Sequence, residues 1–178
     1  PSSIPNLLNF INENTSIAFN LEEVKIKLTD SDLYYYPFLY LTGHGNIRFS
    51  EDEVGILREY LKKGGFLHAD DNYGMDKSFR REMKRVFPEK EWVELSYNHE
   101  IFHTFYEFPN GLPKIHEHDG KPAQALGLFE GERLIVFYTY ETDLGDGWED
   151  IEVHKDPQYL HEAALKMGVN IIWFALTQ

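Results

Sequence analysis

The chain has 178 residues, of which 42% are hydrophobic and 15% aromatic, and it carries 30 Asp and Glu against 17 Lys and Arg, with no cysteine. This length fits a single domain with one sizeable core, spanning residues 1–178, and the net charge of −13 argues against nucleic acid and acidic membranes as partners. The absence of cysteine excludes disulfides and thiolate nucleophiles, and no apolar run reaches the ~20 residues of a membrane span, so we expect no membrane insertion.

The first third of the chain predicts a helix followed by two strands. Ile4, Leu7, Leu8 and Ile11 recur at helical spacing after a serine cap. Residues 24–28 alternate apolar and lysine side chains, which is typical of a strand with one wet face near a sheet edge. Residues 38–42 are continuously apolar, which predicts a central parallel strand that ends in the turn 43–46.

The middle of the chain predicts strand–helix–strand units. Ser50 and Glu53 form a capping box for a helix that Gly64 and Gly65 close, and residues 66–70 then resume as a strand. A second helix follows, with its buried stripe at Phe79, Met83 and Val86, before a short strand at residues 92–95. Residues 96–124 carry no clear pattern.

The last third predicts a β-hairpin, an acidic loop and a long helix. Residues 125–129 and 133–139 flank a Glu-Gly-Glu turn, and a final helix starts at Asp156 and Pro157. Residues 171–174 are also compatible with a strand. The whole pattern predicts an α/β fold with a doubly wound, mostly parallel sheet, a three-layer sandwich to which the hairpin is added.

Ligands of open α/β sheets gather beyond the carboxyl ends of the strands, which directs attention to the turns after residues 42 and 70. His44 lies between two glycines, and Asp70, Asp71 and Asn72 follow the neighbouring strand. Two adjacent carboxylates can act as an acid/base pair, so we assign His44, Asp70 and Asp71 as candidate catalytic residues. The same residues also serve as ordinary caps and turn formers. The candidate ligand-binding residues are Gly43, Gly45, Asn46, Asn72, His99 and Trp148.

Residues 99–103 spell His-Glu-Ile-Phe-His, a literal match to the zincin motif of two histidines one helical turn apart. Aromatic neighbours and Pro109 argue against a helix there, so we expect neither a zincin nor any other cofactor. A different divalent-metal site is the alternative, and its ligands would come from His99, His103, His116 and His118.

Residues 143–150 combine carboxylates, glycines and Trp148. Their spacing departs from a calcium-binding loop, and the chain has no Gly-x-Ser-x-Gly nucleophile elbow. A lid that stacks Trp148 on a ligand is one interpretation, and an acidic surface loop is the one we favour.

Five ordered blocks resemble one bacterial family, the domain of unknown function family 4159. The blocks are residues 36–45 (YPFLYLTGHG), 64–67 (GGFL) leading into Asp70 and Asp71, 99–102 (HEIF), 145–149 (GDGWE) and 168–170 (GVN). The resemblance implies a fold like that of class I glutamine amidotransferases (flavodoxin-like), in which a catalytic cysteine follows the strand at residues 66–70. Asp71 or Asn72 stands near that position here, which removes the glutaminase mechanism. In block 99–102, Glu100 replaces the proline of the family.

The resemblance also implies a periplasmic or exported protein rather than a cytoplasmic one, with a first β-strand that precedes the segment starting at residue 1. We expect a small polar ligand to be bound or hydrolysed at the strand ends. The alternatives are a non-catalytic binding or scaffold domain that recognises a protein partner, and a divalent-metal-dependent hydrolase.

Overall fold

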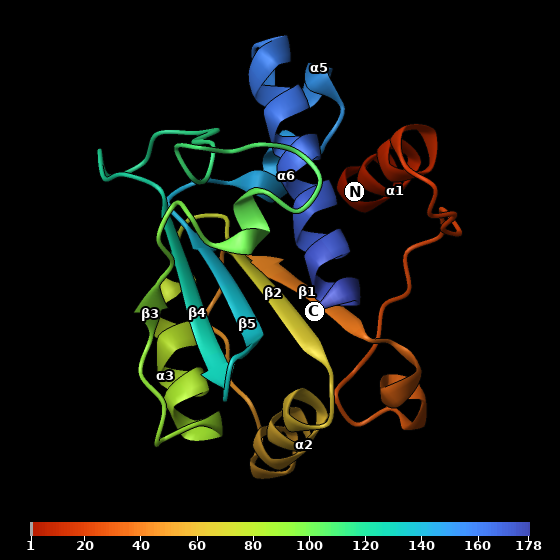
Figure 1. The fold of residues 1–178 in the computed structure, drawn as a ribbon. Coiled ribbons are helices and arrows are strands. Elements are labelled where there is room, and N and C mark those ends of the chain that lie inside the picture. Colours follow the sequence, from red (N-terminus) through yellow and green to blue (C-terminus); the bar gives the residue numbers. More distant parts are fainter. Residues whose placement is uncertain (1) are drawn as a thin grey trace.

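The computed structural model describes residues 2–178 and contains a five-stranded mixed sheet with strand order β1-β2-β5-β4-β3 (Figure 1). The strands are β1 (Phe38–Gly43), β2 (Phe66–Asp71), β3 (Val93–Glu94), β4 (Gln124–Glu130) and β5 (Arg133–Tyr140). The pairs β1/β2 and β2/β5 are parallel, whereas β5/β4 and β4/β3 are antiparallel. The sheet is therefore parallel at its core and antiparallel toward β3.

Helices cover both faces of the sheet, because successive strand residues point to opposite sides. The helices α2 (Glu51–Lys62) and α3 (Asp76–Val86) share one apolar cluster with Leu67 of β2 and Val136 of β5. The helices α1 (Ser3–Asn14) and α6 (Gln158–Thr177) share a second cluster with Phe66 and Phe137. The predicted α/β class is confirmed, and the predicted helices all form. No helix within residues 2–178 has the length and apolar content needed to cross a membrane.

Within residues 2–178, four short helices complete the fold: η1 (Ser31–Tyr35), η2 (Glu100–Phe102), α4 (Leu144–Gly147) and α5 (Ile151–His154). The irregular segment between β3 and β4 is fixed to α6 by Asn170, a buried side chain. Its amide donates to the carbonyls of Ile101 and Tyr106, and its Oδ1 accepts from the Tyr106 amide. Farther along the segment, the Ile115 amide donates to the Thr142 carbonyl. These contacts bring residues 113–118 beside the end of β5.

The prediction of β1 as a central strand is wrong, since β1 lies at the sheet edge with β2 as its one neighbour among residues 2–178. The strand expected at residues 24–28 is also absent, and Val24 is 58% exposed. Alternation alone does not make a strand, because its backbone groups need a neighbouring ladder. The expectation that the hairpin is an addition to the sheet is also wrong: β5 pairs with β2 and lies at the centre.

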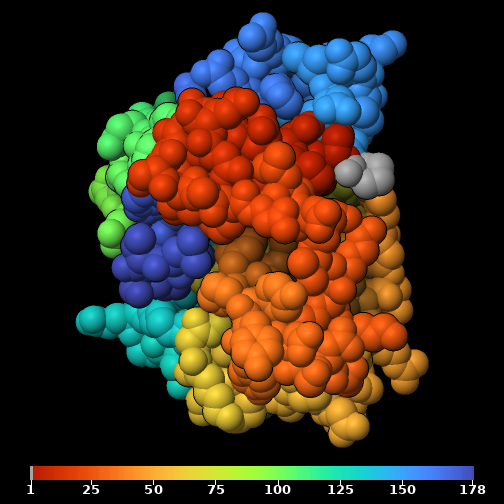
Figure 2. Space-filling model, turned by 90° about the vertical axis from the view of Figure 1, so that its right-hand side faces the viewer, coloured from red at the N-terminus to blue at the C-terminus, as the bar shows by residue number. Residues whose placement is uncertain are grey.

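A mostly apolar cavity of about 550 Å³ separates β1 from residues 19–26, with α1 and α6 on its other sides. Figure 2 shows this face hollowed between the red N-terminal segment and the orange segment that follows it, with the blue end of α6 alongside. Two buried polar atoms in its lining residues, the Tyr40 hydroxyl and His68 Nδ1, have no hydrogen-bond partner among the described residues.

Candidate functional site

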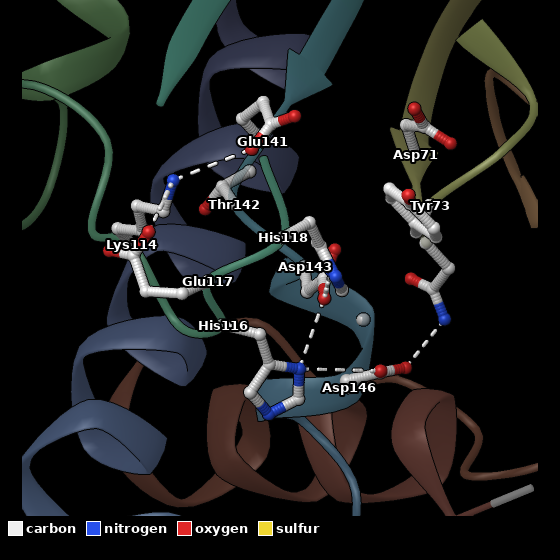
Figure 3. Close-up of polar contacts among 12 residues, drawn as sticks. Asp71, Tyr73, Lys114, His116, Glu117, His118, Glu141, Thr142, Asp143 and Asp146 are labelled. Atoms are coloured by element: carbon white, nitrogen blue, oxygen red, sulfur yellow. Dashed lines mark hydrogen bonds and ion pairs between the residues drawn. The ribbon is translucent and has the colours of Figure 1, made fainter. Parts of the chain in front are cut away.

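The carboxyl ends of β1, β2 and β5 lie at one edge of the sheet, where the chain between β3 and β4 crosses above them in Figure 1. A cluster of histidines and carboxylates from three segments meets beside this edge (Figure 3). We call it the His–Asp cluster. It consists of His116, His118, Asp143, Asp146, His154 and Asp156.

Asp143 lies at the centre of the cluster. It precedes α4 with a left-handed backbone (φ 58°), which is uncommon outside glycine, and only 1% of the residue is exposed. Its Oδ2 is 3.0 Å from His116 Nδ1 and forms a short contact with His118 Nε2. Its Oδ1 is buried and has no partner among residues 2–178. One buried carboxylate therefore orients two imidazoles.

His116 lies among three carboxylates. Its Nδ1 is 3.0 Å from Asp143 and 3.6 Å from Asp146, and its Nε2 is 3.0 Å from Asp156. Burial lowers the pKa of His116, but the charges of Asp156 and Asp143 and their hydrogen bonds outweigh this effect and raise it. The ring is thus held from both sides.

Asp146 joins α4 to the chain after β2. Its Oδ1 accepts from the Asn72 side-chain amide at 2.5 Å, and its Oδ2 is 3.9 Å from His154 Nε2. Burial is the main cause that raises the pKa of Asp146, and Asp143 adds to it, while the nearby His154 opposes the rise. One ligand atom from each of His116, Asp146 and His154 lies within 4.8 Å of the others, a group able to hold a metal ion.

Asp70 binds the backbone of α4 and thereby contacts the segment that carries Asp143 and Asp146. It is fully buried, with Oδ1 accepting from the Thr139 hydroxyl at 2.5 Å and Oδ2 from the Gly145 amide at 2.7 Å. Burial raises its pKa to about 7, although these two hydrogen bonds favour the charged form. Because it binds the backbone of α4, Asp70 fixes the position of Asp143 and Asp146.

Except for Asn72, the other residues predicted at the strand ends lie apart from the cluster. Asp71 is 4% exposed and its Oδ1 accepts from the Met75 amide at 3.0 Å, which closes the turn before α3. Burial raises the pKa of Asp71. His44 is exposed, with its Nδ1 3.4 Å from the Tyr73 carbonyl, and Asn46 contacts Arg81. Of the residues predicted at these two turns, only Asn72 donates directly to the His–Asp cluster.

The histidines of the zincin-like motif point to different neighbours. Residues 100–102 form the short 3-10 helix η2, so His99 and His103 lack the α-helical turn that the zincin geometry requires. The His99 ring packs against Phe174 at 5.5 Å. His103 binds Glu107 and the Tyr97 carbonyl at 2.6 and 2.7 Å.

The expectation of an acidic surface loop at residues 143–150 is wrong, because apolar packing holds α4 inside the molecule. Leu144 is fully buried and Trp148 is 1% exposed. The Trp148 indole donates to the Ala164 carbonyl at 2.8 Å, and its ring packs against Tyr40 on the side of the apolar cavity. The ring of Trp148 thus belongs to the core next to that cavity.

Sequence reasoning missed the roles of His154 and Asp156 and did not connect His116 and His118 with Asp143. The sequence indicated His116 and His118 as candidate metal ligands, and these two residues form one half of the cluster. The other half begins at Asp143, 25 residues after His118. Contacts of Ile115 with Thr142 and of Lys114 with Glu141 bring the two together.

The family model described as "Domain of unknown function (DUF4159)" matches residues 1–176. No curated protein matches the chain.

Proposed function

The chain belongs to the family Domain of unknown function (DUF4159), and we propose that it hydrolyses a small polar substrate at the His–Asp cluster. One observation carries this proposal. The buried Asp143 binds His118 and His116 through one oxygen, in an arrangement that prepares an imidazole to act as a base. We therefore assign the proposed site to the loop after β5 rather than to the turn at His44, where the sequence located it.

His118 is the proposed general base. Its Nε2 faces Asp143, its side chain is 23% exposed, and its ring stacks on Tyr73 at 4.6 Å. With a proton on Nε2 donated to Asp143, the Nδ1 lone pair is available to accept a proton from water. The resulting hydroxide attacks the electrophilic atom of the substrate. The proton on His118 then passes to the leaving group as the bond to that group breaks.

Water is the proposed nucleophile because the chain offers no thiolate, and the Asp70 carboxylate is enclosed. We propose that the fold is related to that of class I amidotransferases. Helices on both faces of a sheet with a parallel core support this relation. The relation concerns the scaffold, since no cysteine follows β2.

The proposal is tested with chromogenic probes: p-nitrophenyl acetate, p-nitrophenyl phosphate and bis-p-nitrophenyl phosphate. We expect turnover of at least one probe, and an about 100-fold or larger loss of kcat/KM in His118→Gln and in Asp143→Asn. His44→Gln is the matched control and should retain full activity, because His44 is exposed and its Nδ1 contacts the backbone carbonyl of Tyr73 rather than a residue of the cluster.

Two results would overturn this assignment. One is the absence of turnover with every probe, which would favour a non-catalytic binding domain. The other is a loss of activity in His44→Gln with none in Asp143→Asn, which would return the site to the turn after β1.

A further inference from the structure

We propose that the chain binds one divalent transition-metal ion between His116, Asp146 and His154. The inference concerns the same cluster as the proposed function and rests on it for the location of the chemistry, but it adds a cofactor. The three ligands come from three segments: the chain before β4, α4 and α5. Figure 3 shows His116 and Asp146 facing each other below Asp143.

The spacing of the side-chain atoms suits a metal centre. Zinc bonds to nitrogen and carboxylate oxygen are about 2.0–2.2 Å long, which in a tetrahedron puts neighbouring ligand atoms ~3.3–3.6 Å apart. His116 Nδ1 is 3.6 Å from Asp146 Oδ2, and that oxygen is 3.9 Å from His154 Nε2. Side-chain rotations, which for His154 include the release of its Nε2 from Glu149 at 3.0 Å, bring all three atoms onto one ion.

The outer contacts of the ligands are those that metal sites use. A metal-binding histidine usually donates its other ring N–H to a carboxylate, which fixes the tautomer and the ring orientation. Here His116 Nε2 faces Asp156 Oδ1 at 3.0 Å, which leaves Nδ1 on the side of Asp146. Asp146 is itself fixed through its second oxygen, which accepts from Asn72 at 2.5 Å. Both ligands are thus oriented toward the same point.

An independent observation also points to a cation. The Asp143 side chain is 1% exposed, it contacts His116, and its Oδ1 has no partner among residues 2–178. Burying a carboxylate oxygen without a donor is costly, and Asp146 and Asp156 bring further negative charge to the same cluster. A bound cation offsets this accumulated charge.

The ligand chemistry selects the class of metal. Two imidazoles and one carboxylate suit Zn²⁺, Mn²⁺ or Fe²⁺, whereas Mg²⁺ and Ca²⁺ prefer sites made of oxygen alone. Three protein ligands leave a fourth position for water, as in catalytic zinc sites. His118 contacts Asp143, which also contacts the ligand His116.

The test uses chelator-treated protein, with Zn²⁺ as the probe and Mg²⁺ for comparison, in isothermal titration calorimetry and in metal analysis after dialysis. We expect one Zn²⁺ per chain, and an affinity for Mg²⁺ at least about 100-fold weaker. His116→Gln and His154→Gln should each weaken zinc binding about 100-fold or more. Asp156→Asn, which changes an outer contact, should weaken it about 10- to 100-fold.

His103→Gln is the matched control, because His103 is a partly exposed histidine bound to Glu107 and distant from the cluster in its contacts. It should bind zinc as the unchanged protein does. Circular dichroism melts without metal establish that each variant is folded. If a variant is not folded without metal, zinc binding is measured on Asn72→Ala in its place, because Asn72 contacts Asp146 without being a ligand.

Zinc that is lost on replacing His103, or retained in both His116→Gln and His154→Gln, would overturn the metal site. The failure of the two proposals is distinguishable. Stoichiometric zinc without turnover of any probe supports the metal site and overturns the hydrolase. Turnover that depends on Asp143 and persists after metal removal, without zinc binding, overturns the metal site alone.

Discussion

Asp70 makes the stability of the protein depend on pH. Its pKa is raised from 3.8 to about 7 by burial, so between these values the folded state holds a proton that the unfolded chain has released. The stabilisation is complete below the unfolded pKa and is lost as pH rises toward 7. For one full proton the free energy of unfolding falls by about 1.4 kcal/mol per pH unit.

We therefore predict that Asp70→Asn reduces the fall in the free energy of unfolding between pH 4.5 and 7. At pH 7.5 the variant should have lost less of its pH 4.5 stability than the unchanged protein has. The asparagine side chain has the shape of aspartate and carries no charge. Its amide oxygen accepts from one of the two donors, the Thr139 hydroxyl or the Gly145 amide. Urea unfolding at several pH values measures the effect. The exposed Asp52→Asn is the control for the change in net charge. If Asp70→Asn keeps the slope of the unchanged protein, Asp70 is ionised in the folded state throughout this range.

Gly145 brings the backbone of α4 close to β1 and β2. A methyl group on Gly145 would lie 2.3 Å from the Tyr40 hydroxyl and 3.2 Å from Asp70 Oδ2, and both atoms are buried. We predict that Gly145→Ala lowers the free energy of unfolding by about 1–3 kcal/mol. Gly55→Ala is the matched control, because nothing lies within 4 Å of its methyl position on α2. It should stabilise by roughly 0.5–1 kcal/mol. Equal effects of the two changes in urea melts would contradict this packing.

The residues of the cluster were only partly predictable. His116 and His118 stood out by their spacing, but the sequence does not reveal that Asp143 adopts a left-handed backbone. That conformation and the hydrogen bond from the Ile115 amide to the Thr142 carbonyl decide which carboxylate the histidines meet. Contacts between segments so far apart leave no periodic pattern in the sequence.

Elements with strong local signals were predictable, and those defined by their neighbours were not. The capping box before α2 forms as expected, with Ser50 accepting from the Glu53 amide and Glu53 accepting in return. The apolar run of β1 predicted the strand but not its place at the sheet edge. Phe38 and Tyr40 pack against the cluster of α1 and α6, and Leu39 and Leu41 pack against that of α2 and α3, so helices cover both faces of this edge strand. Residues 24–28 line that cavity in part, without a strand partner.

Glu82 connects α3 to the chain that follows β1. Its side chain is 2% exposed, and it accepts from the Phe49 amide at 3.0 Å, from Arg81 at 2.8 Å and from Arg85 at 2.5 Å. Burial tends to raise the pKa of Glu82, but the Phe49 amide and the two arginines lower it overall. The carboxylate is thus the preferred form in the folded protein.

We predict that Glu82→Gln lowers the free energy of unfolding by about 1–3 kcal/mol at pH 7, since the amide has one acceptor oxygen and presents its NH₂ to an arginine. The loss is no larger because both arginines are partly exposed and solvent screens their charges. Glu162→Gln, which breaks an exposed ion pair with Lys166, should change the free energy of unfolding much less. Urea melts compare the two variants. A loss no larger than that of the control would mean that water replaces the contacts of Glu82.

For the molecule as a whole, the class of fold followed from alternating strand and helix signals, while the order of the strands did not. The hairpin β4–β5 was expected beside a parallel sheet, yet β5 pairs with β2 at the centre. Every residue of β2 is buried, and six of the eight residues of β5 are. The rigid centre is therefore β2 and β5, and the His–Asp cluster lies at the end of that centre.

This arrangement predicts the pattern of amide hydrogen exchange. Backbone amides open most slowly where strands are paired on both sides and packed under helices. We expect β2 and β5 to exchange about tenfold or more slowly than β1, which has one strand neighbour and faces the cavity. Exchange followed by mass spectrometry on peptides covering residues 38–43, 66–71 and 133–140 measures this order.

Equal protection in β1 and β2 would contradict this prediction. In that case the outer edge of β1 would have to be covered in solution, because an edge strand exposes unpaired N–H and C=O groups. Repeating the exchange over a range of protein concentrations identifies the cover. Protection of residues 38–43 that grows with concentration means that a second copy pairs with β1, whereas protection independent of concentration means that residues of the same chain close over the cavity.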